Sequence, residues 1–269
     1  MPFIASLPMY DWPEIRAATD AWWAGLARHL KAEGFLDVPA TLDREAAREV
    51  QWRSPLLLLS QTCGYPLTHA LQGQVEVVAA PTYAAEGCEE GQYRSAIVVH
   101  AAKGPERPEA LRGATAAFNG DDSLSGHLAL KAVFAPLARD GRFFGRTVES
   151  GSHVRSMDMV AAGEADVAAI DCVSLALAKA HRPKVAEKLR AIAWSPLAPA
   201  LPYVTAAGRP MPEMTRLKRA LTAAATDPAL SAPRDTLLLR RLDFVPTSAY
   251  GRVLEIEAAA DALGYTELA

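Results

Sequence analysis

The sequence predicts a two-lobed α/β protein in which the second lobe is inserted into the first. From the N-terminus, short apolar stretches alternate with amphipathic ones, the order of a doubly wound sheet, so we expect each lobe to be a mostly parallel sheet flanked by helices. At 103–113 this order gives way to a polar, turn-rich segment, KGPERPEALRG, and then begins again. An apolar run at 201–208 returns the chain to the first lobe. We therefore expect lobe 1 to comprise 1–98 and 198–269, and lobe 2 to comprise 99–197.

The first lobe is predicted from continuous apolar runs and one long amphipathic helix. SPLLLLSQ (54–61) has the length of a strand and suits a strand that is buried on both faces. The long helix has Pro13 in its first turn and Gly34 as its C-terminal cap. We expect strands at 2–8, 38–43, 54–61, 75–83, 93–102 and 201–208, and helices at 13–34, 44–53 and 65–73.

The second lobe repeats the alternation, and the tail that follows it is helical. ATAAF (114–118) and ADVAAID (165–171) are short apolar runs, each followed by a stretch with helical periodicity. We expect further strands that end near Glu149 and span 189–195, and helices at 128–138, 153–164 and 174–183. The tail predicts helices at 211–226, 233–242 and 250–264.

Composition and charge exclude two classes of partner. The net charge of −3 and the pI of about 6.1 leave no basic field for nucleic acid. No apolar run approaches the roughly 20 residues of a membrane span. The N-terminus, MPFIASLPMYDWPE, lacks the features of a secretory signal, so we expect a periplasmic protein if a leader has been removed and a cytoplasmic one otherwise.

Three cysteines, Cys63, Cys88 and Cys172, are too few and too scattered for a disulfide framework. Buried or half-buried thiols are the simpler interpretation. Because Cys63 and Cys88 both follow predicted strands of the same half, a disulfide between them is the candidate pairing.

Polar and aromatic residues follow two predicted strands of the first lobe. Tyr10 comes after the first strand, where it can stack on a ligand or donate its hydroxyl; alternatively it packs on the next helix. Gln61, Thr62 and Tyr65 follow the LLLL strand in the turn SQTCGYP, which is either a ligand-facing loop or a plain turn. Ligands of α/β sheets bind beyond the carboxyl ends of strands, so these loops are candidates for one face of a cleft between the lobes.

The loop NGDDSLSGH (119–127) lies between a strand and a helix and offers hydroxyls and glycines without lysine or arginine. Ser123 and Ser125 can present hydroxyls, while the helix start adds N–H groups and the positive end of its dipole. The alternative is a helix cap, for which Asp and Ser are preferred. Four such residues compete for a single cap, and this surplus favours a binding site.

His153 and Asp171 are predicted to lie at the same end of the second sheet. His153 opens a helix, where its ring can donate to an anion, and Asp171 ends an apolar strand. The alternative for Asp171 is a cap for the helix near Ser174. No GxSxG, HxxxH, CxxC or Gly-rich nucleotide motif occurs, so we expect no metal and no cofactor.

Two stretches, LRGATAAFNGDDSLSGHLALKAVF and VESGSHVRSMDMVAAGEADVAAIDCVSLAL, resemble the phosphonate/phosphite-type solute-binding proteins of ABC transporters. The resemblance covers roughly 100–190 and implies the type 2 periplasmic-binding-protein fold. It also implies an ABC permease as partner and a small molecule as ligand. The residues implied as ligand contacts are Ser123, Leu124 through its backbone, Ser125 and Gly126 of the S-x-S-G motif, His153, Asp171 for an amine, and Tyr10 and Tyr65 on the first lobe.

The function we predict is that of a solute-binding protein for an oxyanion or zwitterion, acting in transport or as a soluble sensor. An enzyme on the same fold is the alternative, because His153, Asp171 and the thiols of Cys63 and Cys172 are expected near the cleft. A cytosolic regulatory domain is a third hypothesis.

Overall fold

The computed structural model describes residues 3–269, and the chain forms two compact units. Unit 1 comprises residues up to Ala84, Glu89–Gln92 and Pro199–Tyr250. Unit 2 comprises Ala85–Cys88, Tyr93–Ala198 and Gly251–Ala269. These units differ from the predicted lobes, because Ala85–Cys88, residues 93–98, Ala198 and the C-terminal Gly251–Ala269 belong to unit 2 and not to the first lobe.

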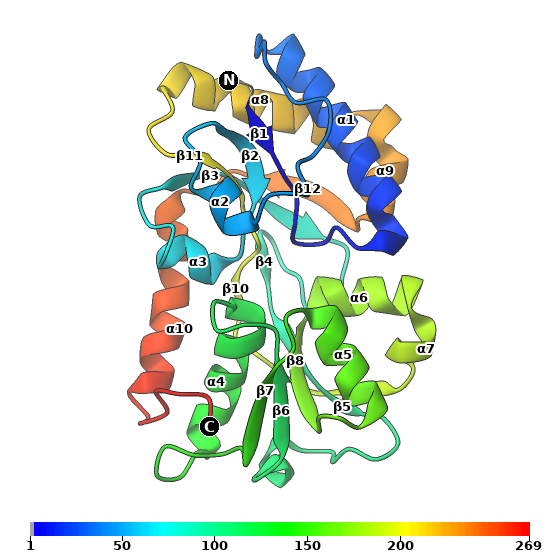
Figure 1. Cartoon of the computed structure of the whole chain (residues 1–269), viewed down its shortest axis with the longest axis vertical. Helices are drawn as coiled ribbons and strands as arrows, with labels where there is room; N and C mark the ends of the chain where they lie inside the picture. Colours follow the sequence, from blue (N-terminus) through cyan, green and yellow to red (C-terminus); the bar gives the residue numbers. More distant parts are fainter. Residues whose placement is uncertain (1–2) are drawn as a thin grey trace. The chain divides into compact units, whose positions relative to one another are not determined.

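The sheet of unit 1 has the strand order β1-β2-β11-β3-β12 (Figure 1). Its strands are β1 (Ile4–Ala5), β2 (Leu57–Gln61), β11 (Tyr203–Ala206), β3 (Val75–Tyr83) and β12 (Leu239–Asp243). The pair β1 and β2 is parallel, whereas β11 and β12, which come late in the chain, run antiparallel to their neighbours. The sheet is therefore mixed. Pro2, the first residue of the strand predicted at 2–8, lies outside the described residues.

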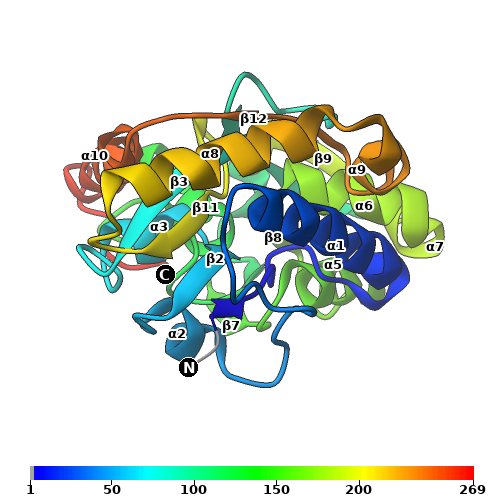
Figure 2. The same ribbon diagram turned by 90° about the horizontal axis from the view of Figure 1, so that it is seen from above.

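The helices of unit 1 pack their apolar stripes against one another and against the sheet. They are η1 (Pro13–Ile15), α1 (Arg16–Ala32), α2 (Arg48–Trp52), α3 (Gly64–Thr68), α8 (Met211–Thr226), η5 (Pro228–Leu230), α9 (Ser231–Thr236) and η6 (Thr247–Tyr250). Helix α1 buries Trp22, Trp23 and Leu26 and runs beside α8 and α9 (Figure 2). Gly34 follows α1 with φ +87°, as predicted for its cap.

Two predicted elements of unit 1 are wrong. The segment 38–43 forms no strand; the Asp43 carboxylate instead accepts the N–H groups of Glu45 and Ala46 and makes a turn. The helix predicted at 233–242 ends at Thr236, and Leu238, with φ +58°, reverses the chain into β12. The run LLLRRL is too short for its hydrophobic periodicity to distinguish a helix from a strand. Pairing with β3 makes it a strand.

The sheet of unit 2 has the order β7-β6-β8-β5-β9. Its strands are β7 (Arg146–Glu149), β6 (Thr115–Phe118), β8 (Val167–Asp171), β5 (Ser95–His100) and β9 (Leu189–Trp194). Strand β6 is parallel to both β7 and β8, so the carboxyl ends of these three strands lie at one edge. Strand β5 runs antiparallel to β8 and β9. Short strands β4 (Gln92–Tyr93) and β10 (Ala198–Pro199) pair with each other where the chain passes between the units.

The helices of unit 2 include the ones that follow the strand ends at this edge. They are η2 (Pro108–Leu111), the π-helical turn η3 (Leu124–Leu128), α4 (Ala129–Phe134), η4 (Ala135–Leu137), α5 (His153–Ala162), α6 (Cys172–His181), α7 (Pro183–Ala186) and α10 (Gly251–Asp261). Across residues 3–269, the structure contains no helix with the length and apolar character that a membrane crossing needs.

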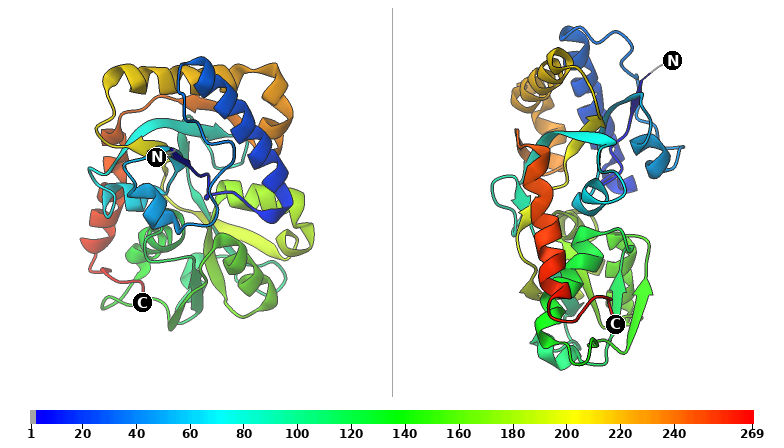
Figure 3. Two further views of the ribbon diagram at one scale, coloured as in Figure 1. Left: turned by 45° about the horizontal axis from the view of Figure 1, so that its top comes forward. Right: turned by 90° about the vertical axis from the view of Figure 1, so that its left-hand side faces the viewer.

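The C-terminal segment joins unit 2 because it completes that unit's core. Helix α10 lies beside α4 (Figure 3), and Ala260, Tyr265 and Leu268 pack with the ring cluster of Phe134, Phe143 and Phe144. The buried ammonium of Lys131 on α4 donates to Asp261 Oδ1 at 3.1 Å and to the carbonyl of Thr266 at 2.6 Å. Lys131, the first basic residue after the serine-rich loop, thus anchors the tail.

Candidate ligand-binding site

The serine-rich loop after β6 forms a capped helix start. Ser123 is the N-cap, and its hydroxyl accepts the N–H of Gly126 at 2.9 Å. The N–H of Leu128 donates to the carbonyl of Ser123, so the first turn is π-helical, a form frequent at functional sites. The N–H groups of Leu124 and Ser125 belong to the set that a helix start leaves without intrahelical acceptors. This start can therefore hold an anion.

Gly126 is required because Asn119 lies against its Cα. A Cβ at position 126 would come within 1.7 Å of Asn119 Oδ1. Among residues 3–269 this buried oxygen finds no hydrogen-bond partner. Gly126 is predicted by the S-x-S-G motif, whereas Asn119 belongs to no motif and its only signal is its place directly after a strand.

Ser125, His153 and Asp171 meet at the edge where β6, β7 and β8 end. The Ser125 hydroxyl lies 2.8 Å from His153 Nε2, and the same nitrogen lies 3.4 Å from Asp171 Oδ2. His153 is held as the first residue of α5 by the capping hydroxyl of Ser152. Asp171 caps α6, because its Oδ1 accepts the N–H of Ser174 at 2.8 Å. Asp171 is therefore a helix cap that also lies beside His153, and its role as a ligand contact stays a prediction.

Burial governs the protonation of His153. It lowers the pKa of His153 below its usual value, because the charged ring loses solvation, while the carboxylate of Asp171 partly opposes the shift. The ring is therefore held mainly in its neutral form at neutral pH. A ligand anion placed beside it would add to the field of Asp171 and favour the charged form.

The cluster does not have the geometry of a serine nucleophile with its relay. In a Ser–His–Asp relay the serine faces one ring nitrogen and the carboxylate faces the other. Here Ser125 and Asp171 both face Nε2 of His153. This arrangement suits hydrogen bonding to a ligand and gives no support to the enzyme alternative.

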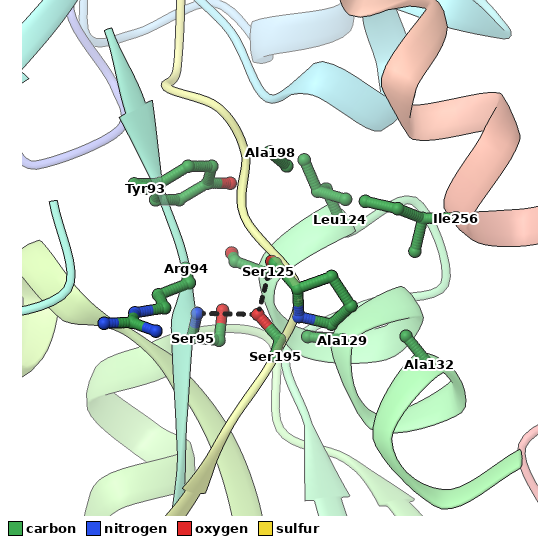
Figure 4. A pocket seen from close by; sticks show the side chains of 11 residues that line it. Tyr93, Arg94, Ser95, Leu124, Ser125, Ala129, Ala132, Ser195, Ala198 and Ile256 are labelled. Carbon is green, nitrogen blue, oxygen red and sulfur yellow. Dashed lines mark hydrogen bonds between the residues drawn. The ribbon is translucent and has the colours of Figure 1, made fainter. Parts of the chain in front are cut away.

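A small pocket, with a volume of about 10 Å³, adjoins the helix start within unit 2 (Figure 4). Ser125 lines it together with Tyr93, Arg94 and Ser195, three residues that are not among the predicted site residues. The guanidinium of Arg94 stacks over the Trp194 ring, 5.0 Å from its centroid. Tyr93 ends β4, Arg94 links β4 to β5, and Ser195 follows β9; none of them belongs to a sequence motif, so only their place near the predicted crossings between the lobes could have indicated them.

In unit 1, Tyr10 and Gln61 line a small aromatic pocket with a volume of about 20 Å³. The ring of Tyr10 meets that of Tyr83 edge-on, with centroids 5.4 Å apart. The amide of Gln61 donates to the Tyr83 hydroxyl at 2.9 Å and to the carbonyl of Leu201 at 3.0 Å. Tyr83, on the long strand β3, was missed because aromatic residues are ordinary in strands.

Thr62 and Tyr65 are engaged in local contacts. Thr62 is fully buried; its N–H donates to the carbonyl of Pro202 and its hydroxyl to that of Cys63. Tyr65 stacks on His69, with ring centroids 3.9 Å apart and planes 8° apart. A ligand role for either residue stays a prediction.

The cysteines are arranged differently from the predicted pairing. Cys88 lies in unit 2 with its sulfur 3.3 Å from that of Cys172, whereas Cys63 lies in unit 1 at the start of α3. Cys172 is therefore the neighbour of Cys88, because the turn that carries Cys88 packs on unit 2. In the described part of the chain, no group of three or more His, Cys, Asp or Glu residues is placed to hold a metal ion.

Two α/β units and a serine-rich helix start beside buried histidine and aspartate define a solute-binding protein of the two-lobed periplasmic type. The family model described as "ABC transporter, phosphonate, periplasmic substrate-binding protein" matches residues 9–249. The chain belongs to this family. A search of curated protein sequences found no significant match.

Similar solved structures confirm the fold class. A phosphonate ABC transporter binding component from Pseudomonas aeruginosa is similar with a TM-score of 0.79 and 17% identity, over 98% of this chain and 88% of that chain. PhnD1 from Prochlorococcus marinus, in complex with methylphosphonate, has a TM-score of 0.76 and 16% identity over 97% and 98%. XAC2383 from Xanthomonas citri, bound to ATP, has a TM-score of 0.71 and 14% identity over 98% of each chain.

Proposed function

We propose that the chain binds a small oxyanion with a phosphonate-like head group at the Ser123–Gly126 helix start of unit 2. The chain acts in the periplasm and delivers this solute to an ABC permease. The family assignment supports transport, and the 2.8 Å contact between Ser125 and His153 carries the assignment of the site. A solute that also has an amine is accepted at Asp171, and Tyr10 and Gln61 are further ligand contacts.

The chemistry of recognition follows from the groups present. The N–H groups of Leu124 and Ser125 lie in the first turn of the helix, where the helix dipole is positive. The Ser125 hydroxyl adds a further donor. His153 becomes a donor to the anion when it takes up a proton, and Asp171 stabilises that charge. Hydroxyls and N–H groups release an anion more readily than a cluster of lysines would, which suits a protein that must hand over its ligand.

Calorimetry with a panel of small anions tests this function. Methylphosphonate, 2-aminoethylphosphonate, phosphite and phosphate are titrated, with sulfate as the comparison anion. We expect at least one phosphorus oxyanion to bind, and Ser125→Ala to weaken it by about 10- to 100-fold, since a hydrogen bond to a charged group is lost.

The matched control is Ser231→Ala, because Ser231 is an exposed serine of α9 in unit 1. Its affinity should equal that of the unmodified protein. If the whole panel fails to bind, or if Ser125→Ala binds as tightly as Ser231→Ala, the site is assigned wrongly.

A further inference from the structure

We propose that Cys88 and Cys172 form an intrachain disulfide that fastens the Ala85–Cys88 turn to the first residue of α6. The proposal rests on the geometry of unit 2 and does not depend on which ligand the protein binds. It assigns the bridge to a pair of cysteines that lie 84 positions apart in the sequence.

The two sulfur atoms already lie in contact. Their separation is 3.3 Å, so a short approach of the two side chains forms the bond. Both backbones are fixed by hydrogen bonds: the N–H of Cys88 donates to the carbonyl of Ala85, and the N–H of Cys172 donates to that of Arg94, each at 3.1 Å. The fold therefore holds the two thiols close together, because the main chain at each cysteine is held by a hydrogen bond.

Gly87 allows the turn to pack closely against Trp194 and Cys172 of unit 2. Its φ is +95°, and a Cβ there would lie 2.7 Å from the Trp194 ring and 3.1 Å from the Cβ of Cys172. Only a residue without a side chain can come this close in this conformation. The contact of Gly87 with Cys172 brings the next residue, Cys88, to the partner thiol.

Both flanks of the turn belong to unit 1, since Ala84 precedes it and Glu89 follows it. A disulfide between Cys88 and Cys172 would thus link the short Ala85–Cys88 turn covalently to α6 of unit 2. It would also fix the residue that follows Asp171, whose carboxylate caps α6 and faces His153. The bridge stabilises the start of α6, where the candidate site has its acidic group.

The oxidant is a small-molecule disulfide, the class of oxidant that an oxidising compartment contains. Cys88 is half-buried and Cys172 is buried, so Cys88 attacks the oxidant first. This step forms a mixed disulfide and releases one thiol. Cys172 then loses its proton and attacks the Cys88 sulfur, which forms the Cys88–Cys172 bond and releases the second thiol. Two protein thiols are oxidised and one disulfide oxidant is reduced to two thiols.

The second step is expected to be the slower one. The hydrogen bond with Cys88 and burial both raise the pKa of the Cys172 thiol above its usual value, so little thiolate is present. Once Cys88 carries the mixed disulfide, that hydrogen bond is lost, but burial still disfavours the thiolate of Cys172 and keeps this step slow.

Thiol counting and peptide mapping on the full chain test the proposal. After incubation with oxidised glutathione, the denatured protein should show one thiol, Cys63, and a proteolytic map should contain a Cys88–Cys172 cross-linked peptide. Reduced protein should show three thiols. The thermal midpoint of the oxidised form should exceed that of the reduced form by several degrees, since the bridge closes a loop of roughly 84 residues.

Three variants separate the pairings. Cys63→Ser should still form the bridge, whereas Cys88→Ser and Cys172→Ser should lose both the cross-link and the rise in midpoint. The map of the unmodified protein decides even if a variant folds poorly. Three thiols after oxidation, stable glutathione adducts on Cys88 or Cys172, or a cross-linked peptide that contains Cys63 would each overturn the proposal.

Discussion

The hydroxyl of Ser125 and the Nε2 atom of His153 lie 2.8 Å apart, although 28 positions separate them in the sequence. Parallel pairing of β6 with β7 and β8 produces this contact, because each strand is followed by a turn at the same edge. Ser125 follows β6, His153 follows β7 and Asp171 ends β8. One hydroxyl, one imidazole and one carboxylate are thereby collected from three separate strand ends.

The first prediction is that anion binding is coupled to proton uptake by His153. Burial lowers the pKa of His153, so the ring is mainly neutral before binding, and a bound anion favours its charged form. At pH 7 to 8, calorimetric enthalpies should therefore depend on the ionisation enthalpy of the buffer, with up to about one proton taken up per ligand. His153→Gln should reduce this dependence. Identical enthalpies in phosphate-free buffers of different ionisation enthalpy would contradict the coupling.

The second prediction concerns folding stability in acid. The folded-state pKa of His153 lies below its unfolded value, so the unfolded chain binds the proton more tightly. This contribution to the free energy of unfolding is complete above about pH 6.5 and is lost as the pH falls. Denaturation by urea between pH 7.5 and 5 should show a smaller decline for His153→Gln than for the unmodified protein. Ser125→Ala keeps the imidazole and should keep most of the decline.

The helix start and the two residues near it could be predicted because each lies in a short local pattern. S-x-S-G after a strand, histidine after the capping Ser152, and aspartate at the end of an apolar strand are all visible without tertiary structure. The order of strands and helices in unit 2 follows for the same reason. The sequence does not predict which atoms are in contact. Ser125 and Asp171 both lie close to Nε2 of His153 because of the way the three strands pair.

Other features depend on contacts between distant segments. Arg94 and Ser195 join Ser125 around one pocket only because β5 pairs with β9 and β8. Strand β12 was predicted as helix, since its pairing with β3 is not encoded in its own short run of leucines and arginines. Helix α10 was assigned to the first lobe from its position in the chain, but its apolar side completes the core around Phe134.

The third prediction separates helix capping from ligand binding. Ser123 accepts the N–H of Gly126, so Ser123→Ala removes a cap and should lower the free energy of unfolding by about 1 kcal/mol. Ser125→Ala should act mainly on affinity for the anion. Urea midpoints and calorimetric affinities measured on both variants compare the two effects. Equal losses of affinity with no loss of stability would mean that Ser123 is not the structural cap.

The fourth prediction concerns Lys131, the buried anchor of the C-terminal segment. Lys131→Met keeps the apolar stem but loses the donors to Asp261 and to the carbonyl of Thr266, so stability should fall by about 1 to 3 kcal/mol. Amide hydrogen exchange should rise in 261–269, while anion affinity stays unchanged. The control is Lys179→Met, whose exposed ion pair with Glu86 is 3.9 Å long and should contribute less than about 0.5 kcal/mol.

The fifth prediction is that a single methyl group at position 126 damages both stability and binding. In Gly126→Ala the new Cβ would overlap Asn119 Oδ1, with 1.7 Å between them, so either the asparagine or the helix start must move. Overpacking of this kind costs about 1 to 3 kcal/mol. Displacing the helix start should also weaken anion binding, because the N–H groups of Leu124 and Ser125 shift with it.

The control for this change is Gly251→Ala, because Gly251 opens α10 and a Cβ there meets nothing within 4 Å. It should be neutral or slightly stabilising. The origin of the Gly126→Ala defect is tested by adding Asn119→Ala, which removes the overlapping oxygen. In the double-mutant cycle, the combined variant should be more stable than the two single effects predict when added. Strict additivity in urea denaturation would show that the contact between Asn119 and Gly126 is not the cause.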